Sequence, residues 1–459
     1  MKADLLVTGG LVGTMNPNRR FFQKGAVAIH GNRIVAVGEA GDLEASVEAE
    51  RVLRVPGRMV LPGFINLHSH SALSILRGVA EDRGPGSIYS LMMPVENVMT
   101  EEDGYHMTML GMFELVRLGT TTVVENWNKM DGAARTVEQI GIRAVISEIV
   151  SDAALLEVGS GSYRFDPVKG DEGLKRGMAI VDRWHGKAGG RISVQLSPHA
   201  PDTCSPELLK TIGEEARRRG LGITLHVAQT VGEVAQVQAA HGCGSVELME
   251  RTGLLGPDVI AAHCIHVSER EIGLLAESGT VVSHNPAINA KRGKIAPAIR
   301  ILEAGGTVGI GTDNMHGNIV EAWKFAISGA RISTGDGTKL QSMQAMEMVT
   351  IGGARALGMA DRLGSLEVGK LADVVIVDMR KPHLYPLIHP IGSFVHNGMG
   401  SDVETVIVDG KVVVENGRLQ TVAPETILES AQSTADSVWN RMQERFDVPR
   451  PWPIGPSGV

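Results

Sequence analysis

The chain has 459 residues, 43% of them hydrophobic and 21% charged, which is typical of a globular protein with a large core. A net charge of −8 and an aromatic content of 4% give no basis for binding nucleic acid or a membrane surface. No apolar run reaches the roughly 18 to 20 residues that span a bilayer. Cys204, Cys243 and Cys264 show no CxxC spacing, which favours reduced thiols in the cytoplasm. The expected partner is a small-molecule substrate.

The two ends of the chain have a similar β-rich texture. Residues 3–60 contain short apolar pieces separated by Gly and Asn turns, and residues 364–420 repeat that pattern. Neither end offers enough strands for a stable sheet alone. We therefore expect residues 1–60 and 361–425 to form one small β-sandwich-like domain. Residues 426–459 are expected to form a C-terminal helix and a Pro-rich tail that wraps the surface or a partner subunit.

Residues 61–360 alternate short apolar segments with helical patterns. Eight segments have the composition of strands: 64–70, 120–126, 142–149, 191–200, 222–229, 259–266, 279–286 and 307–314. This alternation predicts an α/β fold, a distorted (β/α)₈ TIM barrel. The catalytic groups of such barrels lie at the carboxyl ends of the strands.

The first of these strands ends in the sequence FINLHSH. Alternate side chains of a strand point to the same face, so His68 and His70 project together while Ser69 points away. Two imidazoles on one side of a strand end can share a metal ion. The alternative is an edge strand with two solvated histidines.

Polar residues also end the later strands. The fifth to eighth strands contain His226, His263, His284 and Asp313, each within an otherwise apolar run. Any one of them could be a hydrogen-bonded core residue. Together, at corresponding strand ends, they favour a site that activates water with a metal ion.

These strand ends carry a resemblance to a known family. The matching segments are PGFINLHSH, RLGTTTVVE, SPHAPDTCS, TLHVAQ, AAHCIH, VVSHNP and GIGTDN, followed by GGARALGMADRLGSLEVGKLADVVIVD. The sequence resembles the amidohydrolase superfamily, in the mononuclear branch of cytosine- and adenosine-type deaminases and triazine hydrolases. Phenylurea and thiocarbamate hydrolases also belong to this branch. The family habit of homo-oligomerisation is expected here as well.

The resemblance implies a role for each strand-end residue. One divalent metal would be bound by four side chains: His68, His70, His226 and Asp313. His263 would orient or deprotonate the attacking water, Asp313 would carry its proton, and His284 would contact the water or the developing oxyanion. Such a nitrogen and oxygen set suits Zn²⁺, with Fe²⁺, Co²⁺ or Mn²⁺ as alternatives. The segment RISVQLSPHA contains no lysine to bridge two metals, which predicts a mononuclear site.

One position departs from the deaminase pattern. Deaminases of this branch typically carry glutamate three residues after the fifth-strand histidine, where this chain has Gln229. An amide cannot supply the proton that activates a heterocycle, although Glu233 lies one helical turn on. We therefore predict hydrolysis of a C–N or C–S bond in an amide, urea, carbamate or thiocarbamate of a small apolar nitrogenous compound. The alternatives are a deaminase or dechlorinase of an amino-azine (triazine, pterin or purine), and a catalytically silent binding scaffold.

Further substrate contacts are predicted around these strand ends. Besides Gln229, the candidates are His199, Asn314, His316, Trp127 and Tyr89. The alternative is core packing for the two aromatic residues and a solvated loop for His316. The basic stretch NAKRGKIAP is most simply a solvated loop, yet Lys291 or Arg292 could meet an anionic substituent.

Overall fold

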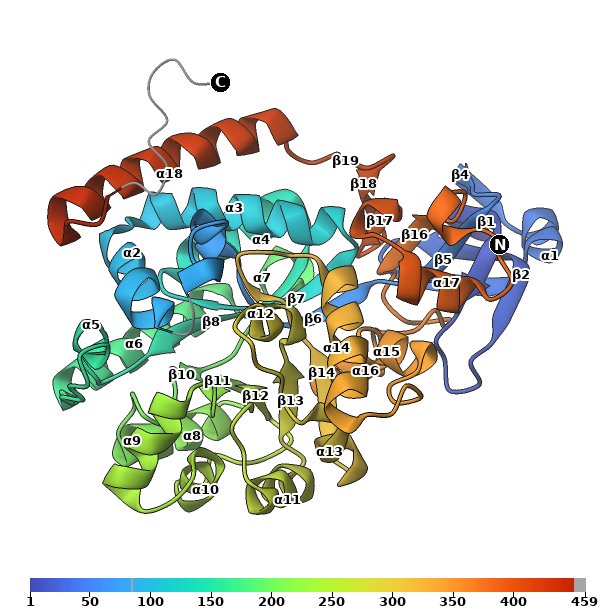
Figure 1. The fold of residues 1–459 in the computed structure, drawn as a ribbon. Coiled ribbons are helices and arrows are strands. Elements are labelled where there is room, and N and C mark those ends of the chain that lie inside the picture. The colour runs from blue at the N-terminus through green and yellow to red at the C-terminus, as the bar shows by residue number, and fades with distance from the viewer. Residues whose placement is uncertain (84–85, 450–459) are drawn as a thin grey trace.

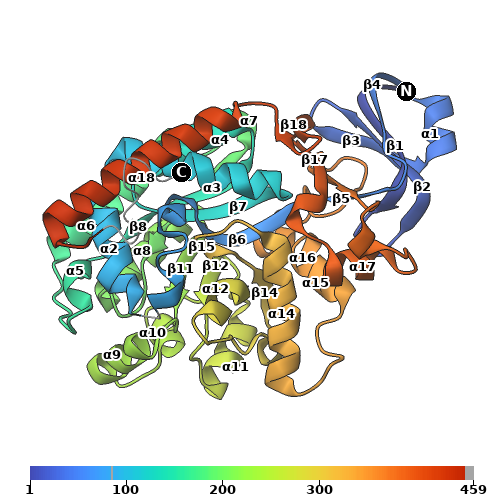
Figure 2. The same ribbon diagram turned by 45° about the horizontal axis from the view of Figure 1, so that its top comes forward.

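The computed structural model describes residues 1–83 and 86–449. A barrel of strands and helices occupies one side of the molecule, and a separate sheet made of both chain ends occupies the other (Figures 1 and 2). This arrangement confirms the predicted α/β barrel with an additional terminal sheet. The predicted Pro-rich tail falls largely on residues 450–459, which lie outside the described residues.

Parallel strands form the barrel in two connected arcs. The first arc contains β6 (Phe64–His70), β7 (Thr120–Trp127), β8 (Arg143–Val150), β9 (Ile192–Val194) and β10 (Ser197–Pro198). The second contains β11 (Ile223–Val227), β12 (Val259–His263), β13 (Val281–His284) and β14 (Thr307–Ile310). A parallel bridge between Leu196 and Ile223 joins the arcs, and β15 (Asp313–Asn314) pairs with β6. The segments predicted at 191–200 and 307–314 each divide into two short strands.

Helices connect the barrel strands. The larger ones are α3 (Glu101–Arg117), α4 (Met130–Ile140), α6 (Pro167–Trp184), α8 (Pro206–Arg218), α9 (Val231–His241), α11 (Glu269–Ser278) and α14 (Ile319–Thr334). Shorter ones are α2 (Met93–Val98), α5 (Leu155–Val158), α7 (Lys187–Gly190), α10 (Ser245–Arg251), α12 (Pro286–Lys291), α13 (Ala298–Glu303), α15 (Ser342–Met348) and α16 (Ile351–Ala356). Thr100 and Ser268 begin α3 and α11 with capping boxes, which satisfy backbone N–H groups of the first turn.

The terminal sheet has nine strands drawn from both ends of the chain. The N-terminal end supplies β1 (Lys2–Gly13), β2 (Phe21–His30), β3 (Arg33–Glu39), β4 (Glu48–Arg54) and β5 (Arg58–Pro62), with α1 (Ala40–Ser46). The C-terminal end supplies β16 (Val374–Asp378), β17 (Val403–Val408), β18 (Lys411–Glu415) and β19 (Arg418–Leu419), with α17 (Pro390–Asn397) nearby. The two sets meet where β16 pairs antiparallel with β5. Because β5 runs directly into β6, this sheet holds the start of the first barrel strand.

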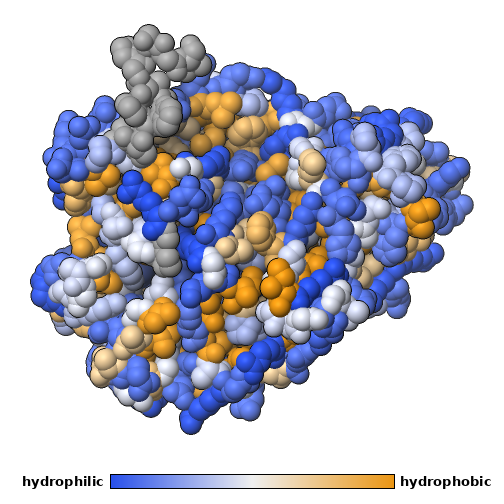
Figure 3. All heavy atoms as spheres, viewed as in Figure 1, coloured by the Kyte–Doolittle hydropathy of each residue, from blue (hydrophilic) through white to orange (hydrophobic). Residues whose placement is uncertain are grey.

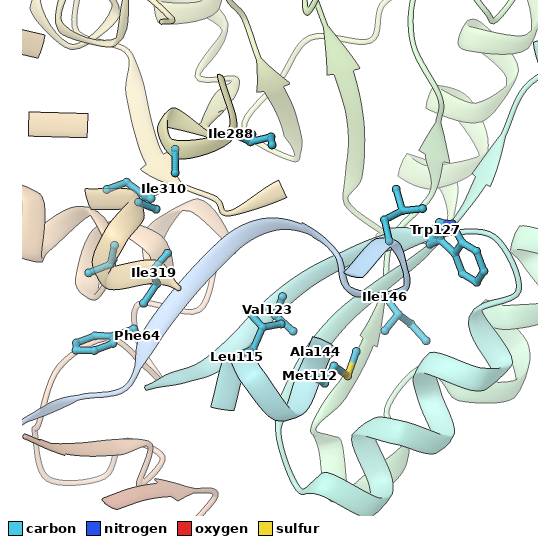
Figure 4. Packing of buried hydrophobic residues seen from close by; sticks show 14 of the residues in the cluster. Phe64, Met112, Leu115, Val123, Trp127, Ala144, Ile146, Ile288, Ile310 and Ile319 are labelled. Atoms are coloured by element: carbon cyan, nitrogen blue, oxygen red, sulfur yellow. The ribbon is translucent and has the colours of Figure 1, made fainter. Parts of the chain in front are cut away.

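Buried apolar residues of the barrel strands and the surrounding helices form one continuous cluster. Figure 4 shows Met112 and Leu115 of α3 beside Val123 of β7. Phe64 meets Trp323 edge to face with ring centroids 5.3 Å apart, a geometry that aromatic pairs favour. Such burial contributes about 1.5–3 kcal/mol for each large side chain.

The C-terminal helix α18 (Pro424–Phe446) packs along α3 and α2 (Figures 1 and 2). Arg441 of this helix forms an ion pair with Asp103 of α3. On the face shown in Figure 3, apolar residues form separate groups among hydrophilic ones. Among residues 1–83 and 86–449, no helix combines the length and apolarity needed to cross a bilayer.

A candidate metal centre at the barrel mouth

Five buried polar side chains come together where β6, β11 and β12 end and β15 begins. Asp313 Oδ1 lies 3.7 Å from His68 Nε2 and 3.5 Å from His70 Nε2. Asp313 Oδ2 lies 3.9 Å from His263 Nε2, and the Nε2 atoms of His70 and His226 are 3.1 Å apart. The exposed fraction of each of these residues is 6% or less. The structure therefore places the four predicted metal ligands around one point, with His263 beside them.

Backbone carbonyls fix the tautomers of two of these histidines. His70 Nδ1 hydrogen-bonds the carbonyl oxygen of Asn126, and His226 Nδ1 hydrogen-bonds that of His199 at 2.8 Å. A carbonyl only accepts, so each Nδ1 carries the hydrogen and each neutral ring keeps a lone pair on Nε2. The two lone pairs face each other across 3.1 Å. This contact is unfavourable alone and favourable when a cation lies between the two atoms.

Several atoms at the same point are buried without a hydrogen-bond partner among the described residues. They are both ring nitrogens of His68, Nε2 of His263 and Oδ2 of Asp313. Buried polar atoms are normally paired, so this cluster requires an explanation. Ligand atoms of His68, His70 and His226 lie within 4.8 Å of one another, as do those of His68, His263 and Asp313. The nitrogen and oxygen donors fit a divalent ion such as zinc.

Burial keeps the histidines neutral. It lowers the pKa of His70 and of His226 to about 4, and it lowers the pKa of His68 and His263 well below the ordinary value. Neighbouring imidazoles lower the pKa of His68, His226 and His263 further. At neutral pH these rings therefore offer lone pairs to a metal rather than protons.

Backbone strain is concentrated at two of these residues. His263 has φ 76° and Asp313 has φ 65°, values that L-residues rarely adopt. His263 is the last residue of β12 and Asp313 is the first residue of β15. Strain of this kind persists where the surrounding structure enforces it, and it is common at functional sites.

Two further predicted histidines lie close by. His284 ends β13, is buried, and leaves Nδ1 without a partner among the described residues. His199 follows β10, and its Nδ1 lies 2.7 Å from Thr203 Oγ1. The bond to Thr203 orients the His199 ring, and the backbone carbonyl of His199 accepts the hydrogen bond from His226.

Two adjoining cavities lie near this cluster, and the smaller one reaches three of the predicted metal ligands. The smaller, of about 30 Å³, is lined by His70, His226 and Asp313 together with the predicted contacts His199, Gln229 and Asn314. The larger, of about 250 Å³, shares Gln229 and Ile88 with it. Three of the predicted substrate contacts thus border the space beside the metal ligands.

The other three predicted contacts lie elsewhere. Trp127 packs against α3, where a Cβ on Gly104 would lie 2.6 Å from the indole ring, and it belongs to the core cluster. Tyr89 lies beside Gly159 and lines neither cavity. His316 lines a separate small pocket with His70 and Asp313, and both its ring nitrogens are buried without partners among the described residues. A substrate-binding role for these three remains a prediction.

The sequence analysis did not single out Glu96, which lines the smaller cavity. Burial raises the pKa of Glu96 to about 7, and the Asn128 side-chain amide donates to its Oε2 at 3.0 Å. The signal was present in the sequence, because Glu96 is a lone charge within the apolar run LMMPVENV. The criterion that identified His226 applies to it equally.

Glu233, the other proton source considered, is tied to the backbone. Its Oε1 accepts from the Ala228 N–H at 2.6 Å and its Oε2 from the Gln229 N–H at 2.7 Å. The Ser245 hydroxyl also donates to Oε1, at 2.9 Å. The carboxylate lines neither cavity, and its role is to hold the loop between β11 and α9.

Comparisons with known proteins extend over nearly the whole chain. A family model described as Amidohydrolase family matches residues 59–413. The chain is 40% identical over 417 residues to the 5-methylthioadenosine/S-adenosylhomocysteine deaminase of Desulforudis audaxviator, covering 90% of this chain and 94% of that protein. It is 37% identical over 442 residues to the 5'-deoxyadenosine deaminase of Methanosarcina acetivorans, covering 95% and 98%. The crystal structure of an adenosine deaminase from Xanthomonas campestris with bound zinc superposes with a TM-score of 0.88 at 30% identity, covering 95% and 99%.

Proposed function

The chain belongs to the amidohydrolase family, as a hydrolase of carbon–nitrogen bonds, and we propose that it releases the amino group of an adenosine-type heterocycle. The observation that carries this proposal is the buried cluster at the barrel mouth, with its unpaired nitrogen and oxygen atoms. The relatives matched over most of the chain are named deaminases of adenosine derivatives. This support favours the amino-azine alternative of the sequence analysis over the amide-type substrates.

The residues proposed to hold the metal are His68, His70, His226 and Asp313. A divalent ion bound there supplies a Lewis acid that makes hydroxide available at neutral pH. Zinc is the proposed ion because the donors are nitrogen and oxygen and the Xanthomonas campestris structure holds zinc.

The proposed proton carrier is Asp313. Its Oδ2 has no hydrogen-bond partner among the described residues and lies 3.9 Å from His263 Nε2. A carboxylate in this position accepts a proton from the attacking water and passes it to the departing amine. His263 holds the water in line by hydrogen bonding, and His284 contacts the oxygen that adds to the ring carbon.

Glu96 is proposed to contact the sugar of an adenosine-type substrate. Its carboxyl group lines the cavity beside the metal ligands and is held by Asn128. Ribose hydroxyl groups are donors, and Glu96 Oε1, to which Asn128 does not donate, is a suitable acceptor for them.

Gln229 supports a second candidate function. A deaminase that protonates its heterocycle needs an acid beside the ring, and a carboxamide at this position supplies hydrogen bonds only. Substrates with a carbonyl carbon, such as amides and ureas, need no ring protonation. Amide or urea hydrolysis is therefore the second candidate.

Substrate screening with measured metal content tests the proposal. The protein is reconstituted with zinc, its metal content is measured, and ammonia release is followed with 5'-deoxyadenosine and 5'-methylthioadenosine. A parallel panel contains neutral phenylureas and anilides. We expect one zinc per chain and turnover of the adenosine derivatives. Turnover confined to the ureas and anilides would establish the second candidate, and a chain that binds far less than one metal would refute both.

A further inference from the structure

The cavity of about 250 Å³ beside the metal centre has an unusual balance of charge. Its lining includes Arg292, Lys294 and His266, together with the neutral side chains of Gln229 and Thr230. No carboxylate is among the described residues that line it. The overall chain is acidic, with a net charge of −8, so the basic lining does not reflect the general composition.

Arg292 is the buried member of this set. Its side chain is only 7% exposed, and Nη1 and Nη2 are both buried without a hydrogen-bond partner among the described residues. The nearest recorded carboxylate oxygen is Asp313 Oδ2, 3.9 Å from Nη1, which is too far for a hydrogen bond. Glu81 acts on Arg292 only at longer range. A buried guanidinium without a bound acceptor is costly, so its presence requires a ligand or a structural role.

The neighbouring lysine distinguishes these two possibilities. Lys291 is the last residue of α12 and faces Glu321 of α14, with Nζ 3.9 Å from Oε1. The Lys291 ammonium group therefore faces α14, and Lys291 does not line the cavity. Arg292 follows directly and turns into the cavity, where the structure offers no carboxylate of its own within hydrogen-bonding distance.

The chemistry of the site defines the ligand. The Nη1 and Nη2 groups of a guanidinium form a planar fork that matches the two oxygens of a carboxylate. Gln229 borders both this cavity and the metal cavity, so a group held here is continuous with a substrate at the metal ligands. Gln229 is neutral and leaves the charge of Arg292 available. The Thr230 hydroxyl adds one donor, and Lys294 adds a second positive charge.

We infer that Arg292 binds a carboxylate group of the preferred substrate, so that this hydrolase favours an anionic nitrogenous compound over a neutral one of the same class. The inference rests on the proposed function only in placing the reacting carbon at the same metal centre. It refines that function by adding a preference for negative charge at the end of the substrate nearest Gln229. Arg292 is a specificity residue in this view.

Binding of two isosteric probes to the zinc-loaded protein tests the inference. Benzoate carries the carboxylate, benzamide is its neutral counterpart, and inorganic phosphate tests a tetrahedral anion. Calorimetry should show that benzoate binds at least about tenfold more tightly than benzamide or phosphate. Arg292→Met should remove this preference, while Lys291→Met, which loses a charge from the same helix, should keep it.

Other outcomes separate the inference from the proposed function. Benzoate binding that persists in Arg292→Met would place the anion on the metal and overturn the inference. If Arg292→Met does not fold, Arg292→Lys decides, because it keeps the charge and loses the fork. It should weaken benzoate and leave benzamide unchanged, and equal affinities for wild type and Arg292→Lys would overturn the inference. Preferred binding of phosphate would overturn the carboxylate assignment. Arg292-dependent benzoate binding in a protein that hydrolyses neither panel would uphold the anion site and refute the proposed function.

Discussion

Two arginines are buried to the same degree in different parts of this molecule, and their surroundings are opposite. The Arg143 side chain, at the junction of barrel and terminal sheet, is 5% exposed and lies 3.1 Å from Asp373 and 3.2 Å from Asp409. Burial alone would lower its pKa, but the two carboxylates raise the pKa of Arg143. Arg292 is 7% exposed and has no hydrogen-bond partner on Nη1 or Nη2, and burial lowers its pKa despite Asp313 and Glu81.

The presence or absence of carboxylate partners distinguishes a buried arginine that stabilises the fold from one that is available to a ligand. Arg143, Asp373 and Asp409 satisfy one another, since both carboxylates pair with Arg143 and the Asp409 N–H also donates to Asp373 at 2.8 Å. The barrel mouth leaves Arg292, His68 and Asp313 with unfilled hydrogen-bonding capacity. Unpaired buried charges are expensive, so a site that retains several of them is organised for something that binds there.

The largest effect is expected from removing a metal ligand. His68→Ala and Asp313→Asn should each lower kcat/KM at least about 1000-fold, because each removes part of the donor set that activates water. The zinc content of His68→Ala should fall well below one ion per chain. His30→Ala is a suitable control because His30 lies on the terminal sheet with a side chain 63% exposed. Retained turnover in both site variants would refute the metal centre.

Arg143→Met and Arg292→Met compare the two arginines directly. Arg143→Met strands the Asp373 and Asp409 carboxylates in the interior and should lower the free energy of unfolding by about 3–5 kcal/mol. Arg292→Met strands no hydrogen-bonded partner and removes an uncompensated buried charge, so it should leave that free energy unchanged or raise it. Denaturant titration of the zinc-loaded proteins measures both. Equal losses would show that Arg292 is also a structural residue.

Glu96 should make stability depend on pH. Burial raises its folded pKa to about 7 from an ordinary value near 4.5, so the folded state binds this proton more tightly than the unfolded state. This contribution to stability is complete below pH 4.5 and is lost as the pH rises through 7. Glu96→Gln should therefore gain up to about 3 kcal/mol relative to wild type between pH 4.5 and pH 8. The surface variant Glu429→Gln should show no such gain, and a flat difference for Glu96→Gln would contradict the assignment.

The smallest effect is expected from Gln229→Glu. A carboxylate at this position would compete for Arg292 and should weaken benzoate binding about tenfold. It would also supply a proton donor beside the substrate, so turnover of neutral adenosine derivatives should rise. Parallel calorimetry and ammonia assays measure the two changes. Unchanged benzoate affinity would show that residues 229 and 292 act independently.

The fold and the clustering of the strand-end histidines with Asp313 were predictable because their signals lie in short sequence segments. Strand alternation places His68 and His70 on one face, and the barrel rule places His226, His263 and Asp313 at neighbouring strand ends. The roles of the predicted site residues remain proposals. The sequence could not show which way Arg292 faces, since NAKRGK has the composition of a solvated loop and only one of the two basic residues at the end of α12 faces the cavity. The position of Trp127 was equally unpredictable, because the sequence does not distinguish a large apolar residue in the core from one that lines a pocket.

The pairing of β15 with β6 has a consequence for how the proposed metal site forms. Asp313 lies opposite Ser69, between the two histidines of the first barrel strand, although the chain separates them by almost the whole barrel. The donor set is therefore incomplete until the last strand closes on the first. Ion binding during folding should therefore show when the barrel closes, and a bound ion should stabilise the pairing of β15 with β6. A chain still emerging from the ribosome has no complete site to offer before Asp313 is made.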